Sequence, residues 1–251
     1  MQIITAAIIK GGTGKTTTAT ALAQAAAADK KRVLAIDLDP QANFSFTIGA
    51  DQNAPGSYDL LHGAAAAQII QHTAQGIDAI AASPDLATEQ TRAGSAKRLQ
   101  EAIDPLKKKY DFIIIDTPPT IGELTYNALQ ASTGLLFPLE ADTNSLQGLY
   151  VIADIARQMQ RSNPALQLTG IVITRYDARP KVNRYLREVI AERGQEIGAP
   201  LLATIRSGVA IREAQAMQQS IFDYAPRSKP AEDYKDLYKK IKTGGKKRNG
   251  Y

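Results

Sequence analysis

Cysteine and tryptophan are absent from the 251-residue sequence, and histidine occurs only twice. The lack of cysteine excludes disulfides, thiolate zinc sites and cysteine-held iron–sulfur clusters. His62 and His72 have no third ligand nearby in the sequence, which favours solvent-facing side chains over a metal site. There is also no run of 18 or more apolar residues and no signal-peptide pattern, so we expect a cytoplasmic protein.

Linkers rich in proline, glycine and serine are missing too, up to the C-terminal end of the chain. We therefore predict one domain over residues 1–242, followed by a Gly/Lys-rich tail, 243–251, that is disordered.

Charge is divided unevenly along the chain. Residues 1–174 contain 13 Lys+Arg against 16 Asp+Glu, a net charge of −3, whereas residues 175–251 contain 17 against 9, a net charge of +8. A basic C-terminal third is the pattern expected of a surface that binds a polyanion.

A glycine-rich segment with two lysines lies close to the N-terminus. It follows the apolar run Ile3–Ile9, which we expect to form a buried strand, and precedes an alanine-rich helix over 18–28. Strand, glycine turn and helix together form the context in which such a loop binds phosphate. The predicted nucleotide-binding residues are Lys10, Gly11, Gly12, Thr13, Gly14, Lys15, Thr16 and Thr17.

Each residue type in this segment has a chemical reason. The glycines let backbone N–H groups approach phosphate oxygens, and the helix that follows adds its positive N-terminal end. Lys15 supplies a cation for the β and γ phosphates, and the Thr16 hydroxyl offers Mg²⁺ a hard oxygen ligand.

Carboxylates follow two further predicted strands. Asp37 and Asp39 come after the apolar run 32–36, and Asp116 ends the run 112–115 and is followed by Thr-Pro-Pro. Acids at the carboxyl ends of parallel strands lie where open α/β sheets bind ligands. Asp116 has the position of a Walker B carboxylate, which reaches Mg²⁺ through water or through Thr16.

Three of these motifs resemble those of the ParA/MinD family of ATPases. The first is Lys-Gly-Gly-x-Gly-Lys-Thr-Thr from Lys10, a deviant Walker motif with Ile9 where the generic loop has glycine. The others are Asp-x-Asp-Pro-Gln from Asp37 and Asp-Thr-Pro-Pro from Asp116. The resemblance implies a doubly wound, mostly parallel sheet with helices on both faces.

The resemblance also implies a mechanism. Asp37 would help to hold the Mg²⁺ water shell, and Asp39 would position or activate the water that attacks the γ phosphate. Lys10 would cross to the phosphates of a second subunit in an ATP-sandwich homodimer. The catalytic residues implied are therefore Lys10, Lys15 and Asp39, the metal residues Thr16, Asp37 and Asp116, and the cofactors ATP and Mg²⁺.

Because the loop begins at residue 10, the chain resembles the small ParA-type (Soj-like) proteins that lack an N-terminal helix-turn-helix domain. Such proteins are weak ATPases that bind DNA non-specifically as ATP dimers, at the nucleoid, and are released when a ParB-like or cargo adaptor stimulates hydrolysis. We predict a DNA-binding face from Arg184, Arg187, Arg206 and Arg212, since non-specific binding needs several phosphate contacts.

Two alternatives remain open. A MinD-like membrane-surface ATPase would use a C-terminal amphipathic helix, and Tyr234, Leu237, Tyr238 and Ile241 share one apolar face of a predicted terminal helix. Packing of that face into the core is the interpretation we favour over membrane binding. A ligase similar to dethiobiotin synthetase would need a small-molecule pocket that no motif indicates.

Another predicted helix lies between the two acidic motifs. Leu99, Ile103 and Leu106 have helical spacing and predict an amphipathic helix over 97–110.

One further segment bears on the site. Arg175-Tyr176-Asp177 follows the predicted strand 168–174, and in the ParA family this loop lies near the nucleotide base. The asparagine usual there is absent from this sequence.

Overall fold

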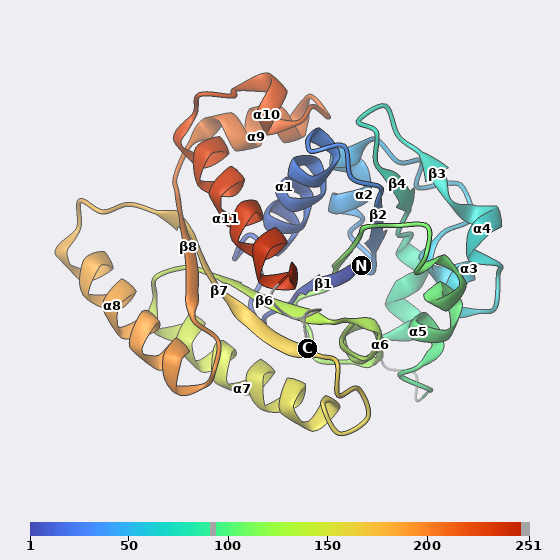
Figure 1. The fold of residues 1–251 in the computed structure, drawn as a ribbon, viewed down its shortest axis with the longest axis horizontal. Coiled ribbons are helices and arrows are strands. Elements are labelled where there is room, and N and C mark those ends of the chain that lie inside the picture. The colour runs from blue at the N-terminus through green and yellow to red at the C-terminus, as the bar shows by residue number, and fades with distance from the viewer. Residues whose placement is uncertain (91–93, 247–251) are drawn as a thin grey trace.

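The computed structural model describes residues 1–90 and 94–246, and its centre is a single eight-stranded sheet (Figure 1). The strand order is β3-β4-β2-β5-β1-β6-β7-β8, and β3 alone pairs antiparallel. The strands are β1 (Gln2–Ala6), β2 (Val33–Asp37), β3 (Gln71–His72), β4 (Asp78–Ile80), β5 (Phe112–Asp116), β6 (Gly134–Leu139), β7 (Gln167–Tyr176) and β8 (Leu201–Arg206).

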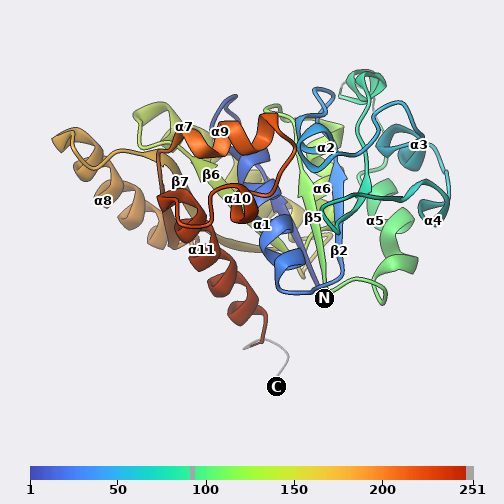
Figure 2. The same cartoon turned by 90° about the horizontal axis from the view of Figure 1, so that it is seen from above.

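Helices cover both faces of this sheet, which confirms the predicted fold class (Figures 1 and 2). On one face lie α1 (Lys15–Ala28), α2 (Asn43–Ile48), α9 (Val209–Ala216), α10 (Ile221–Tyr224) and α11 (Lys229–Lys246). On the other lie α3 (Ser57–Leu61), α4 (Ala66–Ile69), α5 (Arg98–Ile103), α6 (Glu123–Ala131), α7 (Thr143–Met159) and α8 (Lys181–Glu196).

Alternation along the strands builds the two halves of the core. Ile4 of β1 packs under α1, whereas its neighbour Ile3 packs on the opposite face with Leu124 of α6. Both side chains are almost completely buried. Strands buried on both faces need continuous apolar runs, and such runs were the signal that identified β1, β2 and β5 in the sequence.

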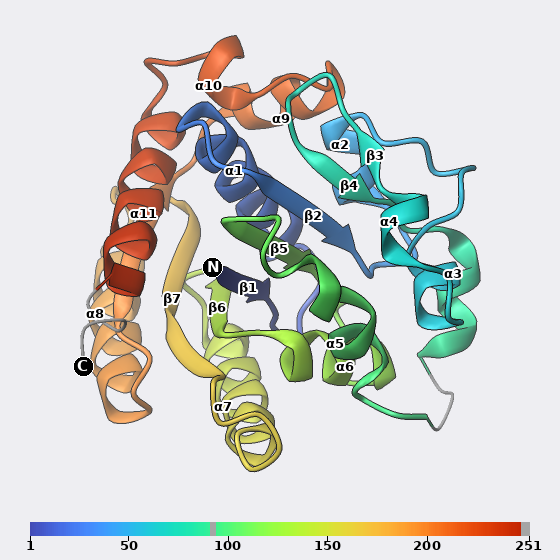
Figure 3. The same cartoon turned by 45° about the vertical axis from the view of Figure 1, so that its right-hand side comes forward.

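The parallel arrangement brings the carboxyl ends of seven strands, all except β3, to one edge of the sheet. The central strand β1 lies between β5 and β6, and β2 pairs with the other side of β5. The glycine loop follows β1, and the two acidic motifs follow β2 and β5 at the same edge. In Figure 3, α9 lies beside α2 above this edge, and a hydrogen bond from Gln218 Nε2 to the Phe46 carbonyl joins the two segments.

Two predicted boundaries were wrong. The helix expected over 97–110 ends at Ile103 and continues only as a 3-10 turn, Asp104–Leu106, because Pro105 cannot donate a helical hydrogen bond. The terminal helix continues to Lys246, so the tail expected from residue 243 begins as helix. Residues 247–251 of that tail lie outside the described residues.

Candidate nucleotide and magnesium site

The glycine loop has the backbone geometry that a phosphate cradle requires. Gly12 and Gly14 have φ angles of 75° and 83°, in the left-handed region that favours glycine. A β-carbon on Gly14 would lie 3.1 Å from the Thr174 side chain, so this position is also sterically restricted. α1 begins at Lys15 without a side-chain cap, which leaves its N-terminal N–H groups facing the loop.

Lys15 is buried inside this loop. Its Nζ donates a hydrogen bond to the Lys10 carbonyl at 3.0 Å. Burial lowers the pKa of Lys15, whereas the nearby carboxylates of Asp116 and Asp39 oppose that shift. An ammonium group that lacks full solvation gains from an anion placed against it, and phosphate oxygens supply such an anion.

Asp116 and Thr16 meet at the base of the loop. The Thr16 hydroxyl donates to Asp116 Oδ2 at 2.6 Å, and Oδ1 of the fully buried Asp116 has no hydrogen-bond partner. Burial, and then the neighbouring Asp37, raises the pKa of Asp116 well above its usual value. A buried carboxylate oxygen without a partner beside a hydroxyl fits a divalent cation.

The rest of a magnesium shell would come from water and phosphate. Among residues 1–90 and 94–246, no group of three or more His, Cys, Asp or Glu side chains is arranged to hold a metal ion. Mg²⁺ in nucleotide sites uses one or two protein ligands plus phosphates and waters, so the residues present fit that ion.

Asp37 lies beside this pair, but both of its oxygens have protein donors. Oδ1 accepts from the Asp39 backbone N–H, and Oδ2 accepts from the backbone N–H and the hydroxyl of Ser45 in α2. Burial raises the pKa of Asp37 to about 6 despite these hydrogen bonds. Asp37 therefore holds α2 and the start of the Asp39 loop in place, a role that sequence reasoning missed because Ser45 lies eight residues away.

Asp39 faces the open side of the site. It lines a cavity of about 480 Å³ together with the glycine loop, Gln41 and Asn43, and its Oδ1 accepts from the Gln41 backbone N–H at 3.0 Å. Among residues 1–90 and 94–246, Oδ2 has no hydrogen-bond donor, so it is available to a water molecule.

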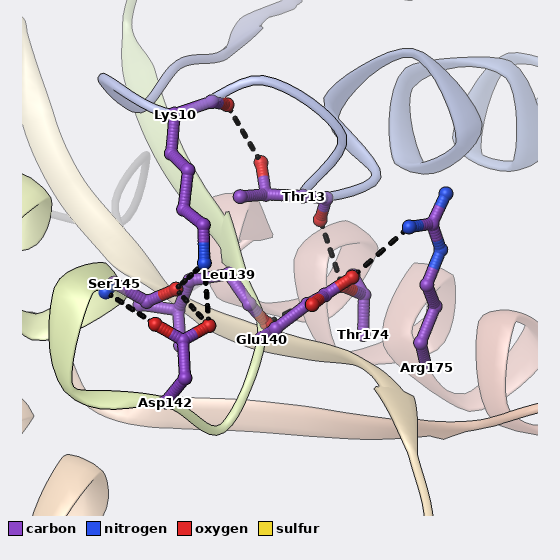
Figure 4. A network of polar contacts seen from close by, with 8 residues as sticks. All are labelled: Lys10, Thr13, Leu139, Glu140, Asp142, Ser145, Thr174 and Arg175. Atoms are coloured by element: carbon purple, nitrogen blue, oxygen red, sulfur yellow. Dashed lines mark hydrogen bonds and ion pairs between the residues drawn. The ribbon is translucent and has the colours of Figure 1, made fainter.

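The Lys10 side chain extends from the glycine loop to the start of α7. Figure 4 shows its Nζ beside Asp142 at the start of α7, at 2.6 Å, and 3.5 Å from the Ser145 hydroxyl. The side chains of Lys10 and Asp142 are 31% and 34% exposed. The two lysines of the motif thus occupy different environments: Lys15 is buried inside the loop, and Lys10 is partly exposed beside α7.

A second contact that the sequence did not indicate joins the loop to β7. The Thr174 hydroxyl donates to the Thr13 carbonyl at 2.7 Å, and the Thr13 hydroxyl donates to the Lys10 carbonyl at 3.4 Å (Figure 4). Thr17 accepts from Gln215 of α9 at 3.3 Å. The position of Thr174 at the carboxyl end of a parallel strand was the available signal.

The four arginines predicted to bind DNA are spread around the edge strand β8. Arg184 and Arg187 lie on α8, and Arg212 lies on α9, across the sheet. Arg206 ends β8 and forms a two-pronged ion pair with Asp233 of α11, which neutralises its charge. Within the described parts of the chain, Arg184, Arg187 and Arg212 have no ion pair.

The apolar face of the terminal helix is used inside the molecule. Tyr234, Leu237, Tyr238 and Ile241 are all at most 7% exposed and pack with α1 in the core. This confirms the core-packing interpretation of the segment. No helix in residues 1–90 and 94–246 is long and apolar enough to cross a membrane.

Comparison with known families gives two matches. The family described as "AAA domain" matches residues 1–168. The family described as "4Fe-4S iron sulfur cluster binding proteins, NifH/frxC family" matches residues 140–248, although this chain has no cysteine to hold a cluster.

Individual relatives belong to the family that the motifs resemble. The chain is 34% identical to the chromosome-partitioning ATPase Soj of Thermus thermophilus over 92% of each chain. It is 33% identical to the chromosome partitioning protein ParA of Myxococcus xanthus over 92% of this chain and 84% of that protein.

A solved structure is similar over nearly the whole length. Cobyrinic acid a,c-diamide synthase from Mycobacterium smegmatis, with bound ATP analogue and magnesium, superposes with a TM-score of 0.84 at 29% identity, covering 98% of this chain and 96% of that one. Since fold, site geometry and relatives agree, the chain belongs to the ParA/Soj family and is an ATPase.

Proposed function

We propose that this protein is an ATP-switched positioning ATPase that forms an ATP-sandwich homodimer, binds DNA non-specifically and is released after adaptor-stimulated hydrolysis. The observation that carries the proposal is the separation of the two motif lysines. Lys15 is buried in the cradle, where it can neutralise a bound phosphate chain, whereas Lys10 is partly exposed and its ammonium group lies outside the cradle, paired with Asp142.

ATP and Mg²⁺ are the ligands that the cradle fits. Mg²⁺ supplies charge neutralisation of the phosphate oxygens when it is bound. Thr16 and Asp116 would hold it, Lys15 and the loop N–H groups would bind the phosphates, and Asp39 would orient the attacking water. Positioning and charge neutralisation account for most of the catalysis in phosphoryl transfer.

Dimerisation would require Lys10 to leave Asp142. The ion pair is about one-third exposed at both ends, and exposed ion pairs contribute little net stability. A polyphosphate carried by a second subunit offers Lys10 more negative charge than a single carboxylate, so exchange of partners is favourable when ATP is present.

DNA binding is assigned to Arg184, Arg187 and Arg212, with Arg206 contributing only if it leaves Asp233. Each phosphate contact adds about 0.9 to the slope of log affinity against log salt. Pairing two subunits doubles the number of contacts and makes the second set effectively intramolecular. Association with the nucleoid follows from such binding.

The membrane alternative has lost its supporting observation. It rested on the apolar face of α11, and that face packs against α1. The ligase alternative, a protein similar to dethiobiotin synthetase, is less well supported. One similar structure is a synthase, but the relatives named above at 33–34% identity are partition proteins.

Co-sedimentation tests the proposal against the membrane alternative. The protein would be mixed with random-sequence DNA on beads or with anionic liposomes, each with ATP or with ADP. We expect retention on DNA that depends on ATP, weakened by Arg212→Glu, and no retention on liposomes. Retention on liposomes with ATP, and none on DNA, would overturn the proposal.

A further inference from the structure

Arg175 is placed by an unusual backbone conformation next to the glycine loop. Its φ angle is 49°, in the left-handed region that few non-glycine residues adopt. The pairing of β7 with β8 changes register between Ile173 and Tyr176, so this conformation belongs to a bulge. Bulges near active sites redirect a side chain, and strained residues persist where the surrounding structure holds them.

The surrounding structure here is the phosphate cradle itself. Thr174, the residue before Arg175, donates its hydroxyl to the Thr13 carbonyl and packs against Gly14. The start of the bulge is therefore fixed to the loop, and the guanidinium is directed along it. Arg175 Nη1 lies 4.0 Å from the position that a β-carbon on Gly12 would occupy.

The partner that holds Arg175 is weakly bound. Nη1 donates to Glu140 Oε1 at 3.0 Å, and the two side chains are 62% and 34% exposed (Figure 4). An ion pair this exposed exchanges readily for a stronger anion. Arg175 also lines both the 480 Å³ cavity of the glycine loop and a neighbouring cavity of about 620 Å³ between β7, β8 and α9.

Charge is distributed asymmetrically around the loop. Asp37, Asp39 and Asp116 lie on the β2 and β5 side of β1, where the magnesium residues are. Arg175 comes from β7, on the other side of β1 beyond β6. A phosphate chain in the cradle would have carboxylates and metal on one flank and this guanidinium on the other.

We propose that Arg175 is a phosphate-binding residue of this ATPase. Its guanidinium breaks the ion pair with Glu140 and contacts the phosphate chain of the nucleotide that is held in the same subunit. The resemblance to the ParA family places this loop near the nucleotide base and implies no contact with phosphate. A guanidinium forms charge-assisted hydrogen bonds with phosphate, and such bonds are stronger than neutral ones.

The primary test is nucleotide affinity, measured by titration of a fluorescent ATP analogue with Mg²⁺. Hydrogen bonds to charged groups are worth about 1.5–3 kcal/mol, which corresponds to roughly 10–100-fold in affinity. Arg175→Gln should weaken binding by about that factor, and Arg175→Lys by less. The matched control is Arg179→Gln, in the same loop. The Arg179 guanidinium pairs with Asp177 and its side chain is 91% exposed, so nucleotide affinity of this variant should stay within about twofold of the parent.

A double variant separates direct contact from a change in local charge. Arg175→Gln leaves Glu140 unneutralised near the phosphates, which could by itself weaken binding. Arg175→Gln combined with Glu140→Gln removes both charges. If Arg175 contacts phosphate, the double variant stays at least about fivefold weaker than the parent, whereas recovery to within twofold would overturn the proposal.

Inorganic tripolyphosphate identifies the part of the nucleotide involved, because it has no base or ribose. Its inhibition constant against the fluorescent nucleotide should rise in Arg175→Gln by a factor similar to that for ATP. An unchanged inhibition constant together with weakened ATP binding would place the contact on the ribose or base and overturn the proposal. Thermal unfolding without nucleotide, expected within a few degrees of the parent, checks that each variant is folded.

Discussion

Asp39 is the residue on which hydrolysis depends in this account. It lines the nucleotide cavity; one oxygen accepts from the Gln41 N–H, and the other has no donor within the described parts of the chain. We expect Asp39→Ala to bind ATP normally but to hydrolyse it at least about 100-fold more slowly, since positioned acid–base groups contribute factors of about 10² or more. Phosphate release and nucleotide titration on the same sample measure both quantities.

The Asp39 prediction fails if turnover stays within about threefold of the parent. In that case another group positions the water, and Asp37 is the first to examine. Asn43, which lines the same cavity, is the second.

Ser45 supports the site from behind. Its hydroxyl donates to Asp37 Oδ2 at 2.7 Å and accepts from the Ala82 backbone N–H at 2.9 Å. Ser45→Ala leaves that buried N–H without a partner, which should lower the free energy of unfolding by about 1–3 kcal/mol. Urea unfolding measures it, with the exposed Ser95→Ala as the control, expected within about 0.5 kcal/mol of the parent. Equal stability of the two variants would show that Ser45 is not a support.

At the scale of elements, α11 is a core helix whose position explains why the membrane alternative lost support. Leu237 is fully buried against α1. We expect Leu237→Ala to lower the free energy of unfolding by about 2–5 kcal/mol. The exposed Lys239→Ala, on the opposite face of the same helix, should change it by less than about 0.5 kcal/mol. If both variants unfold at the same denaturant concentration, the apolar face of α11 is not part of the core.

Elements were predictable where their signal is local. The β-branched runs ending at Asp37 and Asp116 identified β2 and β5. The alanine-rich segment 18–28 identified α1, which begins three residues earlier, at Lys15. The helix over 97–110 was predicted too long, because the spacing of Leu99, Ile103 and Leu106 was given more weight than Pro105.

The site was predictable only in part, for the same reason. Residues within one motif, such as Lys15 and Thr16, were found in the sequence. Contacts between distant segments were not: Lys10 pairs with a residue 132 positions away, and Thr174 reaches the loop from 161 positions away. The left-handed conformation of Arg175 also has no sequence signal, because arginine rarely adopts it.

At the scale of the whole molecule, nucleotide and DNA sites would be coupled through dimerisation. The glycine loop, with Lys10 at its outer end, lies at the carboxyl edge of the sheet, and the arginines proposed for DNA flank the edge strand β8. A single subunit offers few phosphate contacts. ATP would therefore control DNA affinity by controlling the number of subunits that bind together.

The most direct test of this coupling is the affinity for random-sequence DNA as a function of salt, measured with ATP by fluorescence anisotropy. Two proteins are compared. The first has Asp39→Ala alone and should keep ATP bound because it hydrolyses ATP slowly. The second combines Asp39→Ala with Lys10→Ala, which removes the side chain that would bridge the two subunits. We predict tight binding with ATP, a slope of log affinity against log salt steeper than about −2, and loss of binding in the Lys10→Ala combination despite normal ATP binding. Equally tight DNA binding with ADP, or DNA binding that Lys10→Ala leaves unchanged, would contradict the account.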